Sequence, residues 1–415
     1  MINFEKYCQI FANVSIFCFF TLLLVFPRGY NYGSTALLVV SILFLLYTIY
    51  KKINVAGLVK QNKSIFIAIS FYFLTALFFI LFHGEKMKLI DNPLRAFLFL
   101  SVTIFMVYSA VKLDVLLYSI PLGSFISGLI ALYQYYILHL PAAFNEQMKI
   151  QSGDIAMSLG LFSLVIALYL FEIKQNKFAL LAVIAGLFGV LASVLSFTRG
   201  GWIGFPIILI TILYIYRNIL SKKLLGAVIL SILVGGISLS TNEQFMGRIL
   251  DAKNNLVHYS ENSKDGSIGA RLDMWKMGGH AFIEHPISGW NLKELDEYKK
   301  ELADKGIVSH EFIGFSHLHN QFIDELAKKG ILGGIAILGV FLVPLCSFYR
   351  KQKKFPNNKK LKLLTTLGII HVLATMSYCL TQAFFAHNSG NIFYFFILSL
   401  LMAFLITEKQ FKSKL

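Results

Sequence analysis

The chain has 415 residues, of which 56% are hydrophobic and only 14% are charged, and its mean hydropathy is +0.67. A soluble core cannot absorb so much apolar sequence, so an ordinary water-soluble globular protein is excluded. The four cysteines show no CxxC spacing, which indicates neither a disulfide framework nor a zinc site. The net charge of +16 would suit a nucleic-acid-binding protein, but the distribution of the basic residues argues against that class.

Apolar runs recur from one end of the chain to the other, and each is long enough to cross the ~30 Å hydrocarbon core of a bilayer. We therefore predict an all-α, polytopic membrane protein with about 12 transmembrane helices. The predicted spans are 11–27, 34–50, 64–82, 93–112, 114–138, 154–172, 178–197, 201–216, 223–240, 331–349, 361–383 and 389–407. The chain then divides into residues 1–240 with spans 1 to 9, a long loop over 241–330, and residues 331–415 with spans 10 to 12.

Twelve spans place both termini on one side of the membrane, and the basic residues gather on that side. They include Lys51 and Lys52, Lys174 and Lys177, Arg217 with Lys222 and Lys223, the run from Arg350 to Lys354, and the C-terminal Lys409, Lys412 and Lys414. By the positive-inside rule this side is the cytoplasm. The charge is therefore a topology signal, and we expect no binding to nucleic acid.

We expect the loop over 241–330 to lie on the side opposite the cytoplasm. Between Thr241 and Lys329 it carries 14 of the 22 acidic residues and 11 of the 38 basic ones. Amphipathic patterns over Leu272–Phe282 and Leu292–Lys305 predict short helices. A loop of this length is too long to be a bare connector, so we expect a functional segment that lies on the membrane.

Three arginines stand at the outward ends of the spans, where basic residues should be rare. Arg199 lies in the turn Thr198-Arg199-Gly200-Gly201-Trp202, Arg271 lies within the long loop, and Arg95 begins the fourth span. One interpretation is snorkelling toward lipid headgroups, which we favour for Lys86 and Lys88 nearby. The other is function: an arginine at bilayer depth is costly, and guanidinium can grip phosphate through two parallel hydrogen bonds.

His319 ends the long loop, in the stretch Ser316-His317-Leu318-His319-Asn320. It has three possible roles: an interfacial histidine bonded to backbone, a metal ligand together with His317, or a general base. The metal alternative lacks an evident third ligand beyond His310 or His387. A neutral imidazole near pH 7 can accept the proton of a sugar hydroxyl. The nine residues between Asn320 and Gly330 predict a helix that begins near the histidine and ends at the membrane.

This pattern resembles the signature of the O-antigen ligase family, the bacterial enzymes that join O-polysaccharide to lipid A–core. The signature is His319-Asn320, nine residues, then Gly330-Ile331-Leu332-Gly333-Gly334. The arginine turn at Thr198–Gly201 fits the family too, as do Gly269-Ala270-Arg271-Leu272 and His285-Pro286-Ile287-Ser288-Gly289-Trp290 within the loop. The resemblance covers most of the chain and implies a fold like that of the GT-C glycosyltransferases.

The resemblance also implies roles for individual residues. His319 would be the catalytic base or would position the substrate, and Asn320 would orient His319 or an acceptor hydroxyl. Arg199 and Arg271 would bind the pyrophosphate of undecaprenyl-pyrophosphate-linked O-antigen, the donor; Arg95 is added by its placement alone. The acceptor would be lipid A–core oligosaccharide. The implied reaction needs no metal, nucleotide or other cofactor, and it would occur in the bacterial inner membrane on the periplasmic face.

Three other functions compete with the ligase. An O-antigen polymerase would use the same donor with a growing O-chain as the acceptor, and the His-Asn spacing favours the ligase over it. A protein oligosaccharyltransferase of the superfamily is a less favoured alternative, because these relatives usually carry extra C-terminal sequence. A secondary transporter, from a different class, would suit twelve spans, but the two halves of the chain show no internal repeat.

Overall fold

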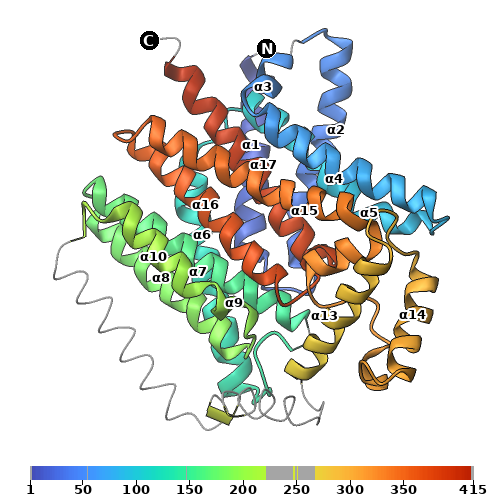
Figure 1. The fold of residues 1–415 in the computed structure, drawn as a ribbon. Coiled ribbons are helices and arrows are strands. Elements are labelled where there is room, and N and C mark those ends of the chain that lie inside the picture. The colour runs from blue at the N-terminus through green and yellow to red at the C-terminus, as the bar shows by residue number, and fades with distance from the viewer. Residues whose placement is uncertain are drawn as a thin grey trace.

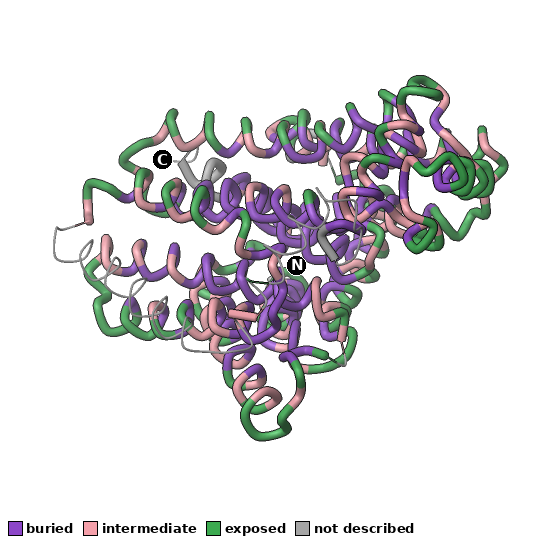
Figure 2. Tube along the Cα trace, turned by 60° about the horizontal axis from the view of Figure 1, so that its bottom comes forward, coloured by how far each residue is buried: buried purple, intermediate pink, exposed green. Residues whose placement is uncertain are grey.

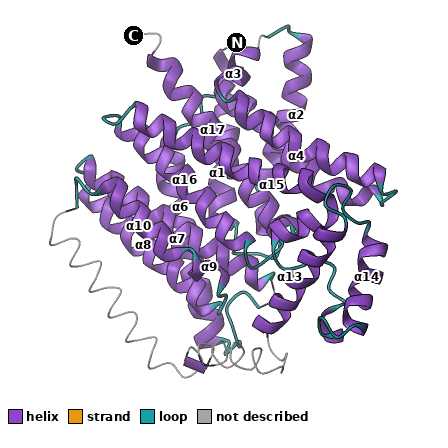
Figure 3. Cartoon of the chain, in the orientation of Figure 1, coloured by secondary structure: helices purple, strands orange, loops and turns teal. Residues whose placement is uncertain are grey.

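The protein is almost entirely helical in a computed structural model, which describes residues 2–53, 55–145, 147–220, 246–247, 250 and 267–412 (Figure 3). Within these residues no strand occurs, and the predicted all-α class is confirmed. The helices of the first half are α1 (Ile2–Leu22), α2 (Ser34–Tyr50), α3 (Ala56–Gln61), α4 (Lys63–Phe82), α5 (Asp91–Tyr108), α6 (Leu113–Leu132), α7 (Lys149–Glu172), α8 (Asn176–Leu195), α9 (Gly200–Ile203) and α10 (Phe205–Tyr216). Those of the second half are α13 (Ser267–Glu284), α14 (Leu292–Asp304), α15 (Gln321–Lys354), α16 (Lys359–Cys379) and α17 (Asn388–Lys412). Short helical turns η1 to η5 cover Gly29–Asn31, Met87–Ile90, Tyr133–Ile137, His310–Phe312 and Phe384–Ala386.

Nine helical segments among the described residues are long and apolar enough to cross a membrane. They are built on α2, α4, α5, α6, α7, α8, α15, α16 and α17, and they match nine of the twelve predicted spans. The prediction of a polytopic membrane protein is therefore confirmed, whereas the full count of twelve stays a prediction. The predicted span 11–27 corresponds to the 21-residue helix α1, and the predicted span 223–240 lies outside the described residues.

The predicted span 201–216 is divided into two short helices, α9 and α10. The break falls at Gly204, and Pro206 lies in the first turn of α10, where its missing amide costs nothing. A Cβ on Gly204 would lie 2.3 Å from the hydroxyl of Ser377, so glycine is needed for the close approach to α16. The 12 residues of α10 are too few to cross the hydrocarbon core alone.

Helices α7, α16 and α17 form the centre of the bundle. In each of these helices, at least 83% of the most apolar 18-residue stretch is buried inside the protein. Figure 2 shows the buried residues concentrated in the middle of the molecule. Helix α8 packs on α7, α5 packs on α17, and α4 and α16 flank α15. The beginning of α1 and the end of α17 lie at the same end of the bundle (Figure 1), as an even number of crossings requires.

The described part of the long loop forms a small helical unit at the opposite end of the bundle. Helices α13 and α14 confirm the two amphipathic stretches predicted there. They share a second apolar core with η4 and the start of α15, and this core includes Met277, Leu295, Leu302, Phe312 and Leu318. Figure 1 shows α13 running beside α15, with α14 outside it. The unit therefore brings the loop against the membrane bundle.

Helix α15 breaks at Gly330, where φ is 56° and ψ is −154°. The amide of Ile331 donates a hydrogen bond of 2.8 Å to the carbonyl of Pro286, and a Cβ on Gly330 would lie 2.5 Å from the carbonyl oxygen of Ile287. Only glycine allows this conformation and this backbone contact. The break separates the helix that begins beside His319 from the membrane-crossing part of α15, which confirms the helix predicted from the nine-residue spacing.

Candidate active site

The backbone at His319 is fixed by the residues that follow it. His319 has a φ of 47°, in the left-handed region that few residues other than glycine adopt. The side-chain oxygen of Asn320 caps α15 by accepting hydrogen bonds from the amides of Phe322 (3.0 Å) and Ile323 (3.1 Å). The amide group of Asn320 donates to the carbonyl of Leu380 at the end of α16, at 3.2 Å. Asn320 thus anchors the chain on which His319 stands.

Three imidazole rings gather at this point. The ring centre of His317 lies 4.5 Å from that of His319 and 5.4 Å from that of His387, which follows η5. The amide nitrogen of the Gln382 side chain lies 2.9 Å from Nε2 of His387, and Gln382 also raises the pKa of His319. Within the described residues, the Nδ1 atoms of His317 and His319 are buried and have no hydrogen-bond partner. The cluster therefore offers ring nitrogens that can engage a substrate.

Burial keeps these imidazoles neutral. It lowers the pKa of His317 to about 4, with the neighbouring His319 as the next cause. Burial also lowers the pKa of His319 and Arg271 lowers it further, whereas the side chains of Gln382 and Asp324 raise it. The pKa of His387 is lowered by burial and then by His319. A neutral His319 at pH 7 can accept a proton, as a general base requires.

Arg199 and Arg271 lie near each other although 72 positions separate them (271 − 199). Arg199 stands in the turn between α8 and α9, and Arg271 lies in the first turns of α13. Burial lowers the pKa of Arg271, the positive charge of Arg199 lowers it further, and the carboxylate of Asp154 raises it. Arg271 also lowers the pKa of His319, so the charge of Arg271 acts on the histidine cluster, and a shared pyrophosphate site of Arg199, Arg271 and His319 stays a prediction.

Asp154 is the site residue that the sequence analysis missed. It lies near the start of α7, and its side chain is fully buried. Its carboxylate faces the arginine turn, because a Cβ on Gly200 would lie 3.0 Å from Oδ1 of Asp154 and one on Gly201 would lie 3.4 Å from the same oxygen. An acidic residue in an apolar run was the signal that could have found it, since ionisable groups inside a membrane are usually functional.

Arg95 is bound by two asparagine side chains. Its guanidinium donates to the side-chain oxygens of Asn92 at 2.8 Å and Asn388 at 2.9 Å. It therefore ties the start of α5 to the start of α17, immediately after His387. Arg95 therefore lies at the same end of the bundle as the histidine cluster, and its role in binding pyrophosphate stays a prediction.

The cluster has no evident metal-binding geometry. Across residues 2–220 and 267–412, apart from the few left undescribed, no three histidine, cysteine, aspartate or glutamate side chains are arranged to hold a metal ion. The charged groups that act on the histidines are Arg271, Asp324 and Lys328, and Arg199 and Asp154 act in turn on Arg271. Guanidinium groups in a half-buried site suit a phosphate or pyrophosphate ligand.

Comparison with known proteins gives the site a context. A family model described as O-antigen ligase matches residues 183–338, a range that contains Arg199, Arg271 and His319. An uncharacterized protein of Haemophilus influenzae is 35% identical over 394 residues, which cover 94% of this chain and 97% of the relative. An O-antigen ligase of Escherichia coli K12 is 29% identical over 294 residues, which cover 68% of this chain and 66% of the relative. The chain belongs to the O-antigen ligase family.

Proposed function

We propose that the protein is an O-antigen ligase, which transfers O-polysaccharide from undecaprenyl pyrophosphate to lipid A–core oligosaccharide. The observation that supports the proposal is the electrostatic influence of Arg199 on Arg271 and of Arg271 on His319. These residues come from three distant segments, a membrane turn, the long loop and the end of that loop. The family of the chain and its relative named O-antigen ligase support the same function.

In the proposed mechanism the two arginines receive the pyrophosphate. Arg199 and Arg271 repel each other, so a bound pyrophosphate would relieve that repulsion and accept hydrogen bonds from both. The preorganised charges would also stabilise the negative charge that grows on the leaving group as its bond to the sugar breaks. We infer that this chemistry needs neither ATP nor a metal ion, because undecaprenyl pyrophosphate is already an activated leaving group.

His319 would act as the general base. A hydroxyl oxygen of the acceptor sugar would attack the anomeric carbon of the donor, and the hydroxyl proton would pass to a ring nitrogen of His319. The electron pair of the broken bond would leave with the pyrophosphate. Attack opposite the leaving group would invert the anomeric configuration. General-base catalysis of this kind contributes about 10²- to 10⁴-fold to a rate.

The proposed orientation places this site at the periplasmic face of the inner membrane, with both termini in the cytoplasm. The predicted cytoplasmic connections carry basic residues such as Lys174 and Lys177 between α7 and α8, whereas Arg199 follows the other end of α8. The positive-inside rule supports this orientation. Labelling with a membrane-impermeant maleimide tests it: a cysteine introduced at Ser316 should react in intact cells, whereas one introduced at Lys177, an exposed residue at the start of α8, should not.

The function is tested in a deletion strain complemented with plasmid-borne variants. We expect the deletion to abolish O-antigen on lipopolysaccharide gels while lipid-linked polymer accumulates, and wild-type protein to restore the ladder. Complementation with His319→Ala should leave the core uncapped although the protein reaches the membrane at normal levels. A core that bears a single repeat would instead assign the protein as a polymerase, and an unchanged ladder would refute both functions.

A further inference from the structure

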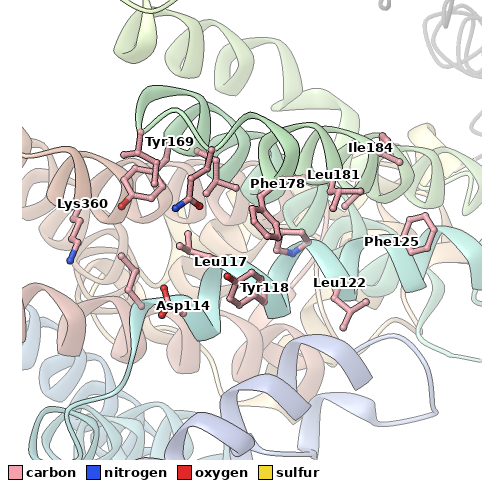
Figure 4. A pocket seen from close by; sticks show the side chains of 17 residues that line it. Asp114, Leu117, Tyr118, Leu122, Phe125, Tyr169, Phe178, Leu181, Ile184 and Lys360 are labelled. Carbon is pink, nitrogen blue, oxygen red and sulfur yellow. The ribbon is translucent and has the colours of Figure 1, made fainter.

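A cavity lies between α6 and α8, remote from the histidine cluster. Its volume is about 500 Å³, and residues of α7 form its floor. Figure 4 shows the apolar side chains of Leu117, Leu122, Phe178 and Leu181 along its walls. Several of these are exposed, Leu181 to 61% and Phe178 to 49%, so the cavity is an open groove on the surface that faces lipid.

The groove arises because the backbones of α6 and α8 approach closely in one half, whereas in the other half larger side chains lie between them and the rings of Tyr118 and Phe178 meet edge to face, 6.2 Å between centroids. In the contacting half, the hydroxyl of Ser124 donates to the carbonyl of Ala185 at 2.7 Å. A Cβ on Gly128 would lie 2.5 Å from the Cβ of Phe188, so the backbones approach closely there. Toward the other end the facing residues are bulky, as with Tyr118 and Phe178. The two helices therefore diverge and leave a wedge-shaped space.

The wide end of the groove is polar. Asp114 and Lys360 line this end, and both are exposed, whereas Phe125 and Ile184 lie at the other end (Figure 4). The polar end lies beside the beginning of α8, and the arginine turn follows the end of that helix, on the other side of the bundle. A lipid whose headgroup lies at Asp114 and Lys360 thus cannot present that headgroup to Arg199.

The length of the groove fits one acyl chain. Asp114 and Phe125 are eleven residues apart on α6 (125 − 114), which corresponds to about 17 Å at about 1.5 Å per residue. Half of the ~30 Å hydrocarbon core is about 15 Å. An acyl chain of a lipid in the leaflet at the Lys360 end would reach the closed end of the groove, whereas a polyprenyl chain far longer than one leaflet would not fit within it.

We propose that this groove is a binding site for a glycerophospholipid with a phosphoethanolamine headgroup. One acyl chain would fill the wedge between α6 and α8. Lys360 would bind the phosphate, and the carboxylate of Asp114 would accept hydrogen bonds from the primary ammonium group. The opposite charges of Asp114 and Lys360 at the mouth favour a headgroup with both charges over a purely anionic one, which Asp114 would repel. By filling the wedge, the lipid would brace α8 and thereby the turn that carries Arg199.

The test is lipid-dependent thermal unfolding of the purified full-length protein in detergent. Phosphatidylethanolamine, phosphatidylcholine and phosphatidylglycerol with identical acyl chains are titrated separately, and apparent affinities are taken from the rise in unfolding temperature. We expect an affinity for phosphatidylethanolamine about three-fold or more above that for the other two, the size of one exposed ion pair. Equal affinities would overturn the site, and tighter binding of phosphatidylglycerol would overturn the headgroup assignment.

Matched variants locate the effect. Asp114→Asn and Lys360→Gln should each remove the headgroup preference, whereas Lys177→Gln, at the same end but outside the groove, should retain it. Leu181→Trp should fill the groove and weaken stabilisation by every lipid. Its control is Leu180→Trp, because Leu180 is 58% exposed but does not line the groove. A preference that survives in Asp114→Asn and Lys360→Gln would refute the proposal. Since the readout is lipid binding, it is independent of glycan transfer.

Discussion

The replacement Gly330→Ala should displace the short helix that begins after His319 relative to the membrane-crossing part of α15. Gly330 combines φ 56° with ψ −154°, a region that is essentially restricted to glycine and costs other residues about 1–3 kcal/mol. The new Cβ would also lie 2.5 Å from the carbonyl oxygen of Ile287 and 2.6 Å from that of Pro286. Because both contacts are with backbone, neither can be relieved by a side-chain rotation. We expect a loss of about 3 kcal/mol in the free energy of unfolding.

The matched control is Gly339→Ala in the same helix. Nothing lies within 4 Å of a Cβ at Gly339, and a helical glycine replaced by alanine gains about 0.5–1 kcal/mol. The two variants should therefore differ by about 3–4 kcal/mol.

The assay is thermal unfolding in detergent alongside glycan transfer in reconstituted vesicles. Gly330→Ala should unfold at a temperature several degrees lower and lose about 10²-fold in transfer rate, because a displacement of His319 by about 1 Å is enough for that loss. A Gly330→Ala protein with the stability and transfer rate of the wild type would refute the argument.

Three further predictions concern the residues around the histidine. Asp154→Asn should lower the transfer rate about 10-fold or more, because Arg271 loses the carboxylate that acts on it. The control Ser158→Ala, one turn along α7, should not lower the rate. Equal rates for the two variants would contradict this role of Asp154. The rate constant kcat/KM should stay level as the pH falls to about 6.5 and should decline below that pH. The reason is that burial lowers the pKa of His319 and only its neutral form accepts a proton. A decline of kcat/KM that begins above pH ~6.5 would count against a buried base. Asn320→Ala and Asn358→Ala each remove a helix cap and should destabilise similarly, by about 0.5–2 kcal/mol, but only Asn320→Ala should lower transfer; an equal effect of both on transfer would show that Asn320 serves stability alone.

Local patterns in the sequence were enough to predict most of the fold. The apolar runs predicted nine helices that the structure contains, and the spacing from Asn320 to Gly330 predicted a helix and its end. The divided span at α9 and α10 was not predicted, because Gly204 packs against Ser377 on a helix far away in the sequence. Breaks that depend on a distant contact are not visible in hydropathy.

The candidate site could be named only in part from the sequence, because local patterns do not show distant contacts. Arg199, Arg271 and His319 carry motif-like surroundings and were named from the sequence. Asp154 and Gln382 have no such surroundings, and they join the site only because α7 and the turn after α16 pack beside the loop. Which of several polar residues at one end of a bundle meet is decided by tertiary packing.

The most direct test of the central claim is the rate of glycan transfer from purified undecaprenyl-pyrophosphate-linked O-antigen to lipid A–core by the reconstituted His319→Ala protein. His310→Ala is its control, because His310 belongs to the same loop but is 64% exposed and contacts none of the site residues named above. We predict a loss of at least about 10²-fold for His319→Ala and a rate close to that of the wild type for His310→Ala. A His319→Ala protein that transfers O-antigen at the wild-type rate would contradict the account.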